Sequence, residues 1–144
     1  MIGYADTSAV VPLLVSEPSS ALCRRFWDDA DVIVTSRVLY VEAAAALAQA
    51  RRMGRLTTQE HREALTILDD LWAQIDVVEI DEPLVQRAAT LAADLGLRGY
   101  DAVHCAAAEQ LNDDNVVAAS GDRQLLDAWS ALGVDTFDTN QSRL

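Results

Sequence analysis

Short apolar runs of strand length alternate with longer helical stretches along this chain, and the alternation constrains its fold more than any other feature. The clearest run is Val32-Ile33-Val34, which is wholly apolar and β-branched, as a parallel strand buried on both faces should be. The remaining runs cover residues 2–5, 77–80, 116–118 and 134–137. Helices are predicted between them, at 7–14, 20–28, 36–53, 58–73, 82–95, 100–111 and 122–132. This order of elements predicts an α/β fold in which a central parallel sheet is flanked by helices on both faces.

Nothing in the sequence divides the chain, which has no linker, repeat or low-complexity segment, and we expect one domain over residues 1–144. No apolar run is long enough to cross a membrane, and the first residues do not resemble a signal peptide. A cytoplasmic protein without membrane contact is therefore expected. The net charge of −12 argues against non-specific wrapping of nucleic acid. All 11 basic residues are arginine, which excludes mechanisms that need a lysine, such as P-loop phosphate binding and Schiff-base chemistry.

Two aspartates follow the carboxyl ends of predicted strands, where ligands bind in open parallel sheets. Asp6 follows the strand at 2–5, and Asp122 follows Gly121 after the strand at 116–118. Each also has a simpler interpretation, Asp6 as the N-cap of the next helix and Asp122 as a first-turn acid that complements the helix dipole. The two aspartates therefore need further acids beside them before they indicate a functional site.

Glu42 is the acid that a structural role explains least well. It lies within a helix that we expect Thr35 or Ser36 to cap, and helical spacing puts it on an apolar face with residues such as Val38 and Ala45. No arginine stands three or four residues away to pair with it. Burying a lone glutamate is costly unless a charged group meets it, although a rotated helix would leave Glu42 exposed. We favour a functional role.

Asp101 lies at the start of the helix at 100–111, three residues before His104. An N-cap role for Asp101 and a local Asp101–His104 contact would account for both residues without any chemistry. Alanines follow both Glu42 and Asp101, however, so the two helices can pack closely enough to bring these acids to one centre. Converging carboxylates repel one another unless a cation neutralises them. Oxygen ligands without paired His or Cys favour Mg²⁺ or Mn²⁺.

The four acids and their neighbours resemble the motifs of the PIN-domain family. The matching segments are Asp6-Thr7-Ser8, the helical Glu42, Tyr100-Asp101-Ala102-Val103-His104 and Ser120-Gly121-Asp122-Arg123. The likeness extends over essentially the whole chain and is strongest to the VapC toxins of bacterial toxin–antitoxin pairs. It implies that strands one and four are adjacent at the centre of the sheet, which would put Asp6 beside Asp122. It also implies an acidic quartet, whose members are Asp6, Glu42, Asp101 and Asp122.

The resemblance implies a Mg²⁺-dependent endoribonuclease toxin, with Mn²⁺ able to substitute, that forms a homodimer and is inhibited by a cognate VapB-like antitoxin. Asp6 and Asp101 would be the core metal ligands, and Glu42 and Asp122 would complete the site. RNA phosphates need cations beyond the metal. The candidate substrate-binding residues are Ser120, Arg51, Arg52, Arg55, Arg98 and Arg123. For the three arginines at 51–55, complementing the dipole at the end of their helix is an equally good explanation.

Two other functions remain open. A structure-specific DNA nuclease is the alternative enzyme on the same fold. A non-catalytic regulatory or interaction domain with an acidic pocket is the alternative of a different class, and the acids would then be helix caps. The absence of lysine and the single early aspartate count against a receiver-like regulatory module.

Overall fold

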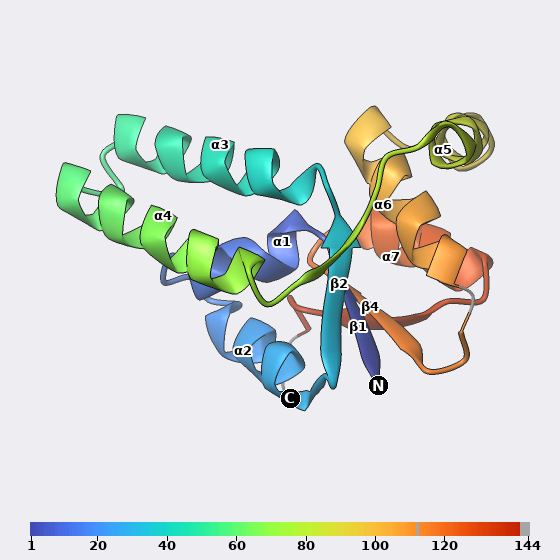
Figure 1. The fold of residues 1–144 in the computed structure, drawn as a ribbon, viewed down its shortest axis with the longest axis horizontal. Coiled ribbons are helices and arrows are strands. Elements are labelled where there is room, and N and C mark those ends of the chain that lie inside the picture. The colour runs from blue at the N-terminus through green and yellow to red at the C-terminus, as the bar shows by residue number, and fades with distance from the viewer. Residues whose placement is uncertain (112, 142–144) are drawn as a thin grey trace.

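A five-stranded parallel sheet lies at the centre of the structure, a computed structural model that describes residues 1–111 and 113–141 (Figure 1). The strands are β1 (Ile2–Ala5), β2 (Val32–Ser36), β3 (Asp76–Val78), β4 (Val116–Ser120) and β5 (Asp135–Asp138). Their order across the sheet is β3-β2-β1-β4-β5, so β1 lies between β2 and β4. Ala5 pairs with Ala119, which places the residues that follow β1 and β4 side by side. The predicted α/β fold and the adjacency of strands one and four are confirmed.

Helices cover both faces of this sheet, as predicted. On one face lie α1 (Thr7–Val10), the 3₁₀ turn η1 (Val11–Leu13), α2 (Ser20–Asp29), α3 (Leu39–Arg52) and α4 (Thr58–Trp72). On the other face lie α5 (Glu82–Leu95), α6 (Gly99–Leu111) and α7 (Arg123–Ala131). Figure 1 shows the first group to the left of the sheet and the second group to the right. Each group buries its own apolar core, with Leu47 and Leu68 in the first, and Leu91, Leu125 and Trp129 in the second.

The main departure from the predicted elements lies between β2 and α3. β2 continues through Ser36, because Thr35 is buried in the sheet and its Oγ1 donates a hydrogen bond to the carbonyl oxygen of Ala5 at 2.6 Å. α3 begins only after Val38, which occupies the N-cap position. The predicted cap at Thr35 or Ser36 is therefore wrong, and Glu42 lies in the first turn of its helix.

The strand at the β3 edge is also shorter than its sequence indicates. β3 ends at Val78, and Ile80, which the apolar run at 77–80 includes, is exposed. An edge strand has a partner on one side only, so apolar sequence there is held less firmly than in β1 or β4.

Among the described residues, no helix is both long enough and apolar enough to span a membrane.

Gly3 lies in β1 at a point where no side chain fits. A Cβ atom added there would lie 2.8 Å from Cζ of Phe26 and 3.1 Å from the Cβ of Ala30. Gly3→Ala should therefore push α2 off the sheet and lower the free energy of unfolding by about 1–3 kcal/mol, measured by urea denaturation. Gly99→Ala is the matched control, because nothing lies within 4 Å of the Cβ that it adds. Equal stability of the two variants would contradict this packing argument.

Candidate active site

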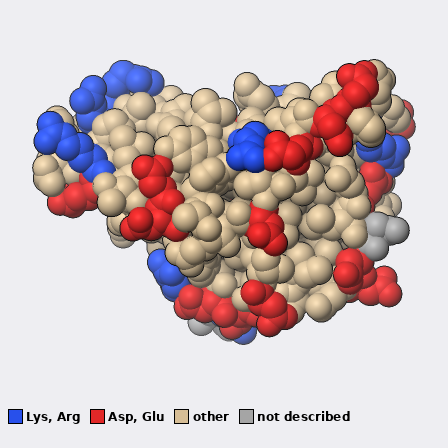
Figure 2. Space-filling view, in the orientation of Figure 1, with Lys and Arg blue, Asp and Glu red and all other residues tan. Residues whose placement is uncertain are grey.

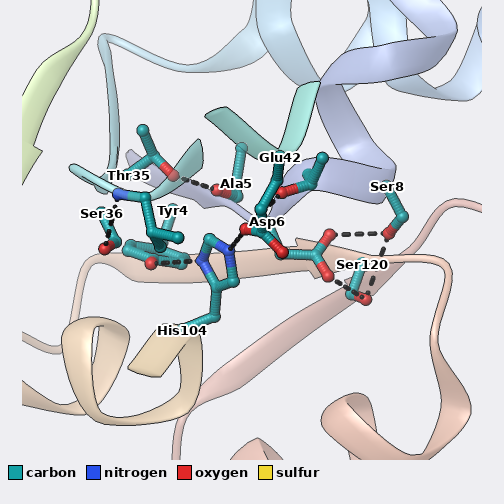
Figure 3. A network of polar contacts seen from close by, with 11 residues as sticks. Tyr4, Ala5, Asp6, Ser8, Thr35, Ser36, Glu42, His104 and Ser120 are labelled. Carbon is teal, nitrogen blue, oxygen red and sulfur yellow. Dashed lines mark hydrogen bonds and ion pairs between the residues drawn. The ribbon is translucent and has the colours of Figure 1, made fainter. Parts of the chain in front are cut away.

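Asp6 is held at the tip of β1 by two serine hydroxyls (Figure 3). Ser8 Oγ donates to Asp6 Oδ1 at 2.6 Å, and Ser120 Oγ donates to Asp6 Oδ2 at 3.0 Å. Asp6 stands at the N-cap position of α1, but its side chain accepts no capping hydrogen bond from a backbone N–H of that helix. The interpretation of Asp6 as a cap is therefore wrong. Only 5% of the surface of Asp6 is exposed, and its carboxylate is held by the two serine hydroxyls and not by the start of the helix.

Ser120 joins the tips of β1 and β4 and does not face solvent. It is fully buried, and its Oγ accepts a hydrogen bond from the backbone N–H of Asp122 at 2.9 Å while donating to Asp6. Ser8 completes the link, since its Oγ accepts from the N–H of Gly121 at 2.8 Å. Substrate cannot reach a hydroxyl in this position. We therefore assign Ser120 to supporting Asp6, in place of the predicted substrate contact.

Glu42 meets a histidine from the opposite helical layer (Figure 3). His104 Nε2 lies 2.7 Å from Glu42 Oε1, and Thr7 Oγ1 donates to the same oxygen at 2.8 Å. The other ring nitrogen, Nδ1, lies 2.8 Å from the hydroxyl of Tyr4. Burial raises the pKa of Tyr4 well above its usual value, so its hydroxyl stays protonated and can donate to Nδ1. The Nε2–H of His104 is then available to donate to Glu42.

This contact corrects the local explanation of His104. Both ring nitrogens are engaged by Tyr4 and Glu42, so a local Asp101–His104 contact, the alternative account of these two residues, does not explain His104. The partner of Glu42 lies 62 residues away in sequence, beyond the reach of any helical spacing rule. The sequence offers one signal for this contact. Glu42 and His104 are polar residues on two apolar helices, and each can serve as the partner of the other.

Asp101 and Asp122 approach the site from α6 and α7. Asp101 is the third residue of α6 and so is not its N-cap, and its side chain is mostly buried, with Oδ2 3.5 Å from Nε of Arg98. Asp122 is the N-cap of α7, because its Oδ1 accepts from the N–H of Gln124 at 2.9 Å. Asp122 is thus an N-cap and not the first-turn acid of its simpler interpretation, and the N-cap interpretation of Asp101 is wrong.

The charges of Asp101 and Asp122 affect the pKa values of neighbouring acids in the site. Burial raises the pKa of Asp6, and the charge of Asp101 adds to that rise against the opposing effects of His104 and the two serines. Burial followed by the charge of Asp122 raises the pKa of Asp101, although Arg98 opposes it. The pKa of Glu42 is lowered, because its contacts with His104 and Thr7 outweigh its burial. Asp6, Asp101 and Asp122 therefore form a chain of mutually repelling carboxylates.

These acids fit a hard divalent cation by chemistry more than by their present spacing. In the part of the chain that the structure describes, no three His, Cys, Asp or Glu side chains are arranged to hold one ion together. The donors at the carboxyl edge are nevertheless all carboxylate oxygens that repel one another, which suits Mg²⁺ or Mn²⁺. Asp6 is raised in pKa partly by the charge of Asp101, so a cation between these two carboxylates would relieve that repulsion.

The predicted phosphate-binding arginines are spread over the molecule. Arg98 lies beside Asp101, whereas Arg123 is paired with Asp138. Arg51 and Arg52 end α3, about 14 Å along the helix axis from Glu42 at 1.5 Å per residue. Figure 2 shows basic side chains gathered at that left-hand end, over the turn between α3 and α4. The structure therefore brings Arg98 to the acids and leaves Arg51 and Arg52 apart from them.

A parallel α/β domain with a carboxylate site at the carboxyl edge of its sheet is the class that this fold and site define. The family model described as "PIN domain" matches residues 4–129 of the chain. The chain belongs to the PIN-domain family. Ribonuclease VapC45 of Mycobacterium tuberculosis (strain CDC 1551 / Oshkosh) is 41% identical over 130 residues, which cover 90% of each chain. The chain therefore belongs to the VapC branch of the family, as its motifs predicted.

Solved structures share the same fold. The structure of FitAB bound to an IR36 DNA fragment contains a chain that matches with a TM-score of 0.74 at 16% identity, covering 100% of this chain and 99% of that one. The structure of VapBC-5 from Mycobacterium tuberculosis, a member of the VapBC family of toxin–antitoxin systems, matches with a TM-score of 0.63 at 20% identity. That match covers 95% of this chain and 98% of the other. At these identities the likeness shows the fold alone.

Proposed function

We propose that this protein is a Mg²⁺-dependent endoribonuclease toxin that hydrolyses RNA phosphodiesters at Asp6 and Asp101. The observation that carries the proposal is the buried carboxylate of Asp6, which two serines orient and Asp101 repels, in a chain 41% identical to Ribonuclease VapC45. Capping a helix does not require both carboxylate oxygens to be oriented in this way. A cation-dependent hydrolase requires oxygen ligands that are already oriented toward the ion.

Each acid has a distinct part in this mechanism. Asp6 and Asp101 would hold the ion, and Asp122 and Glu42 would complete the site directly or through water. When bound, Mg²⁺ polarises the phosphate and eases deprotonation of the attacking water. Ser8 and Ser120 keep both oxygens of Asp6 oriented, and both hydroxyl donors favour its ionised form. Thr7 and His104 hold Glu42 in one position, so the reaction needs no movement of that side chain.

The direct test is cleavage of matched RNA and DNA oligonucleotides by the purified protein. We expect RNA to be cut when Mg²⁺ is present, EDTA to stop the reaction, and Mn²⁺ to restore it. Preferential cutting of DNA would favour the structure-specific nuclease. Absence of any cleavage, together with absence of saturable Mn²⁺ binding, would favour an interaction domain.

Cation binding should weaken on acidification at a higher pH than an ordinary carboxylate site. Protons compete with the ion for Asp6 and Asp101, because burial raises the pKa of both carboxyls above the ordinary range of an aspartate. Calorimetric titration with Mn²⁺ over a pH series measures this competition. The affinity should fall as the pH approaches the raised pKa values from above. Constant affinity down to pH 4 would show that these two residues are not the ligands.

We also propose a VapB-like antitoxin partner and a homodimer. The acidic site, with three repelling carboxylates, is suited to receive a basic side chain of an inhibitor in place of the cation. Coexpression with a candidate antitoxin should yield one complex without RNA cleavage, and light scattering should give the mass of a dimer for the protein alone. An active complex, or a monomeric mass at high concentration, would contradict the respective part.

A further inference from the structure

A pocket of about 610 Å³ opens beside the acids, between the first turns of α3 and α6. Figure 1 shows these two helix ends facing each other above the carboxyl edge of the sheet. Its lining consists of Glu42, Arg98, Gly99, Tyr100, Asp101 and Val103. Two of these residues belong to the acidic site, so whatever enters the pocket lies next to the reacting phosphate of the proposed function. The remaining wall is mostly apolar, which a metal site alone does not require.

Tyr100 lines this pocket. It is 61% exposed although it is a large aromatic residue. Gly99 precedes it, and nothing beyond its chain neighbours lies within 4 Å of the position where Gly99 would carry a Cβ, so the backbone before Tyr100 borders open space. Val103, one turn later on α6, is an apolar residue of the same lining. A largely exposed aromatic side chain beside an apolar one suits a planar ligand.

Arg98 supplies positive charge at the rim of the same pocket. Its side chain is 86% exposed and lies 3.5 Å from Asp101, a surface contact that contributes little energy. Elsewhere arginines such as Arg37 and Arg87 are paired with acids away from the site. Arg98 is therefore placed to exchange its loose contact with Asp101 for the phosphate of a bound ligand.

We propose that this pocket binds one unpaired base of the RNA substrate, which stacks on Tyr100 while Arg98 contacts an adjoining phosphate. The inference rests on the proposed ribonuclease function and adds a base-stacking contact beside the acidic site. A base is neutral and planar, so Glu42 and Asp101 do not repel it, and Arg98 offers a positive charge to the adjoining phosphate. Unpaired bases stacked on aromatic side chains are a common basis of RNA recognition, and each stack contributes measurably to affinity.

The test compares Tyr100→Ala, Tyr100→Phe and the exposed control Val85→Ala on α5. On a single-stranded RNA, Tyr100→Ala should raise KM about 10- to 100-fold, as expected for loss of one base stack, with a smaller change in kcat. Tyr100→Phe keeps the ring and should restore most of the affinity. Val85→Ala should match the wild type. Thermal denaturation should show that all three variants remain folded.

A second measurement separates stacking from a general weakening of the site. After the wild-type cleavage position is mapped, an abasic residue is placed at each flanking position in turn. At one position the abasic residue should strongly reduce RNA cleavage by the wild type. It should hardly change cleavage by Tyr100→Ala, because that variant has already lost the stacking contact. Equal impairment of both proteins at every position would overturn the inference.

The outcomes distinguish the inference from the proposed function on which it rests. If the wild type cuts no RNA, the proposed function itself fails. If the wild type cuts RNA and Tyr100→Ala has the same KM, the function stands and the base pocket is refuted. If Tyr100→Ala leaves RNA kinetics unchanged but weakens binding of a candidate antitoxin, the pocket receives a protein segment instead, which also overturns the inference.

Discussion

Asp101→Asn should lower kcat/KM for RNA cleavage by about 100- to 1,000-fold, because a ligand that carries charge is replaced by a neutral amide. The same change should stabilise the folded protein in EDTA. Burial and Asp122 raise the pKa of Asp101, so its ionised form opposes folding at neutral pH. The stabilisation should be complete above the raised pKa and should disappear as the pH falls through it. Cleavage assays and thermal denaturation measure the two effects.

Asp70→Asn is the matched control for this experiment. Asp70 is an exposed aspartate on α4, so its replacement should change neither cleavage nor stability. A stable Asp101→Asn protein with full ribonuclease activity would exclude Asp101 from the site. Lost activity with a lower melting temperature would instead indicate that Asp101 supports the fold.

His104→Leu should lower the free energy of unfolding by about 2–4 kcal/mol, the second large effect that the structure predicts. Leucine has a similar volume but removes the partner of the buried Tyr4 hydroxyl and one of the two partners of Glu42. Urea denaturation measures the loss.

A double-mutant cycle with Tyr4→Phe identifies the origin of that loss. Tyr4→Phe removes the hydroxyl that His104→Leu leaves unpaired, so the double variant should be more stable than the sum of the two single losses predicts. Strict additivity would show that Tyr4 and His104 do not stabilise each other through this contact.

The sheet was predictable because its signals are local. The β-branched run at 32–34 suits a parallel strand that pairs inside a sheet, and the alternation of strands with helices leaves few arrangements other than a parallel sheet. The same local reasoning failed at Thr35, whose hydroxyl suits a helix cap as well as it suits its actual partner, the carbonyl of Ala5. Only the position of β1 decides between the two, and that is not a local property.

The acids could be named from the sequence, but their supports could not. Asp6 and Asp122 follow strands, and Glu42 has no local partner, so each could be singled out by position. The contacts from Ser120 to Asp6 and from His104 to Glu42 join residues 114 and 62 positions apart. Such pairs are created by packing the sheet and helices, and no spacing rule within one element indicates them.

The hydrogen bonds that run from Tyr4 through His104 to Glu42 and Thr7 link the two helical layers of the domain. His104 belongs to the helical layer of α5–α7, and Glu42 belongs to the layer of α1–α4. A partner that separated α3 from α6 would have to break the hydrogen bond between His104 and Glu42. The position of Glu42 therefore depends on how the two helical layers pack, and not on its own helix alone.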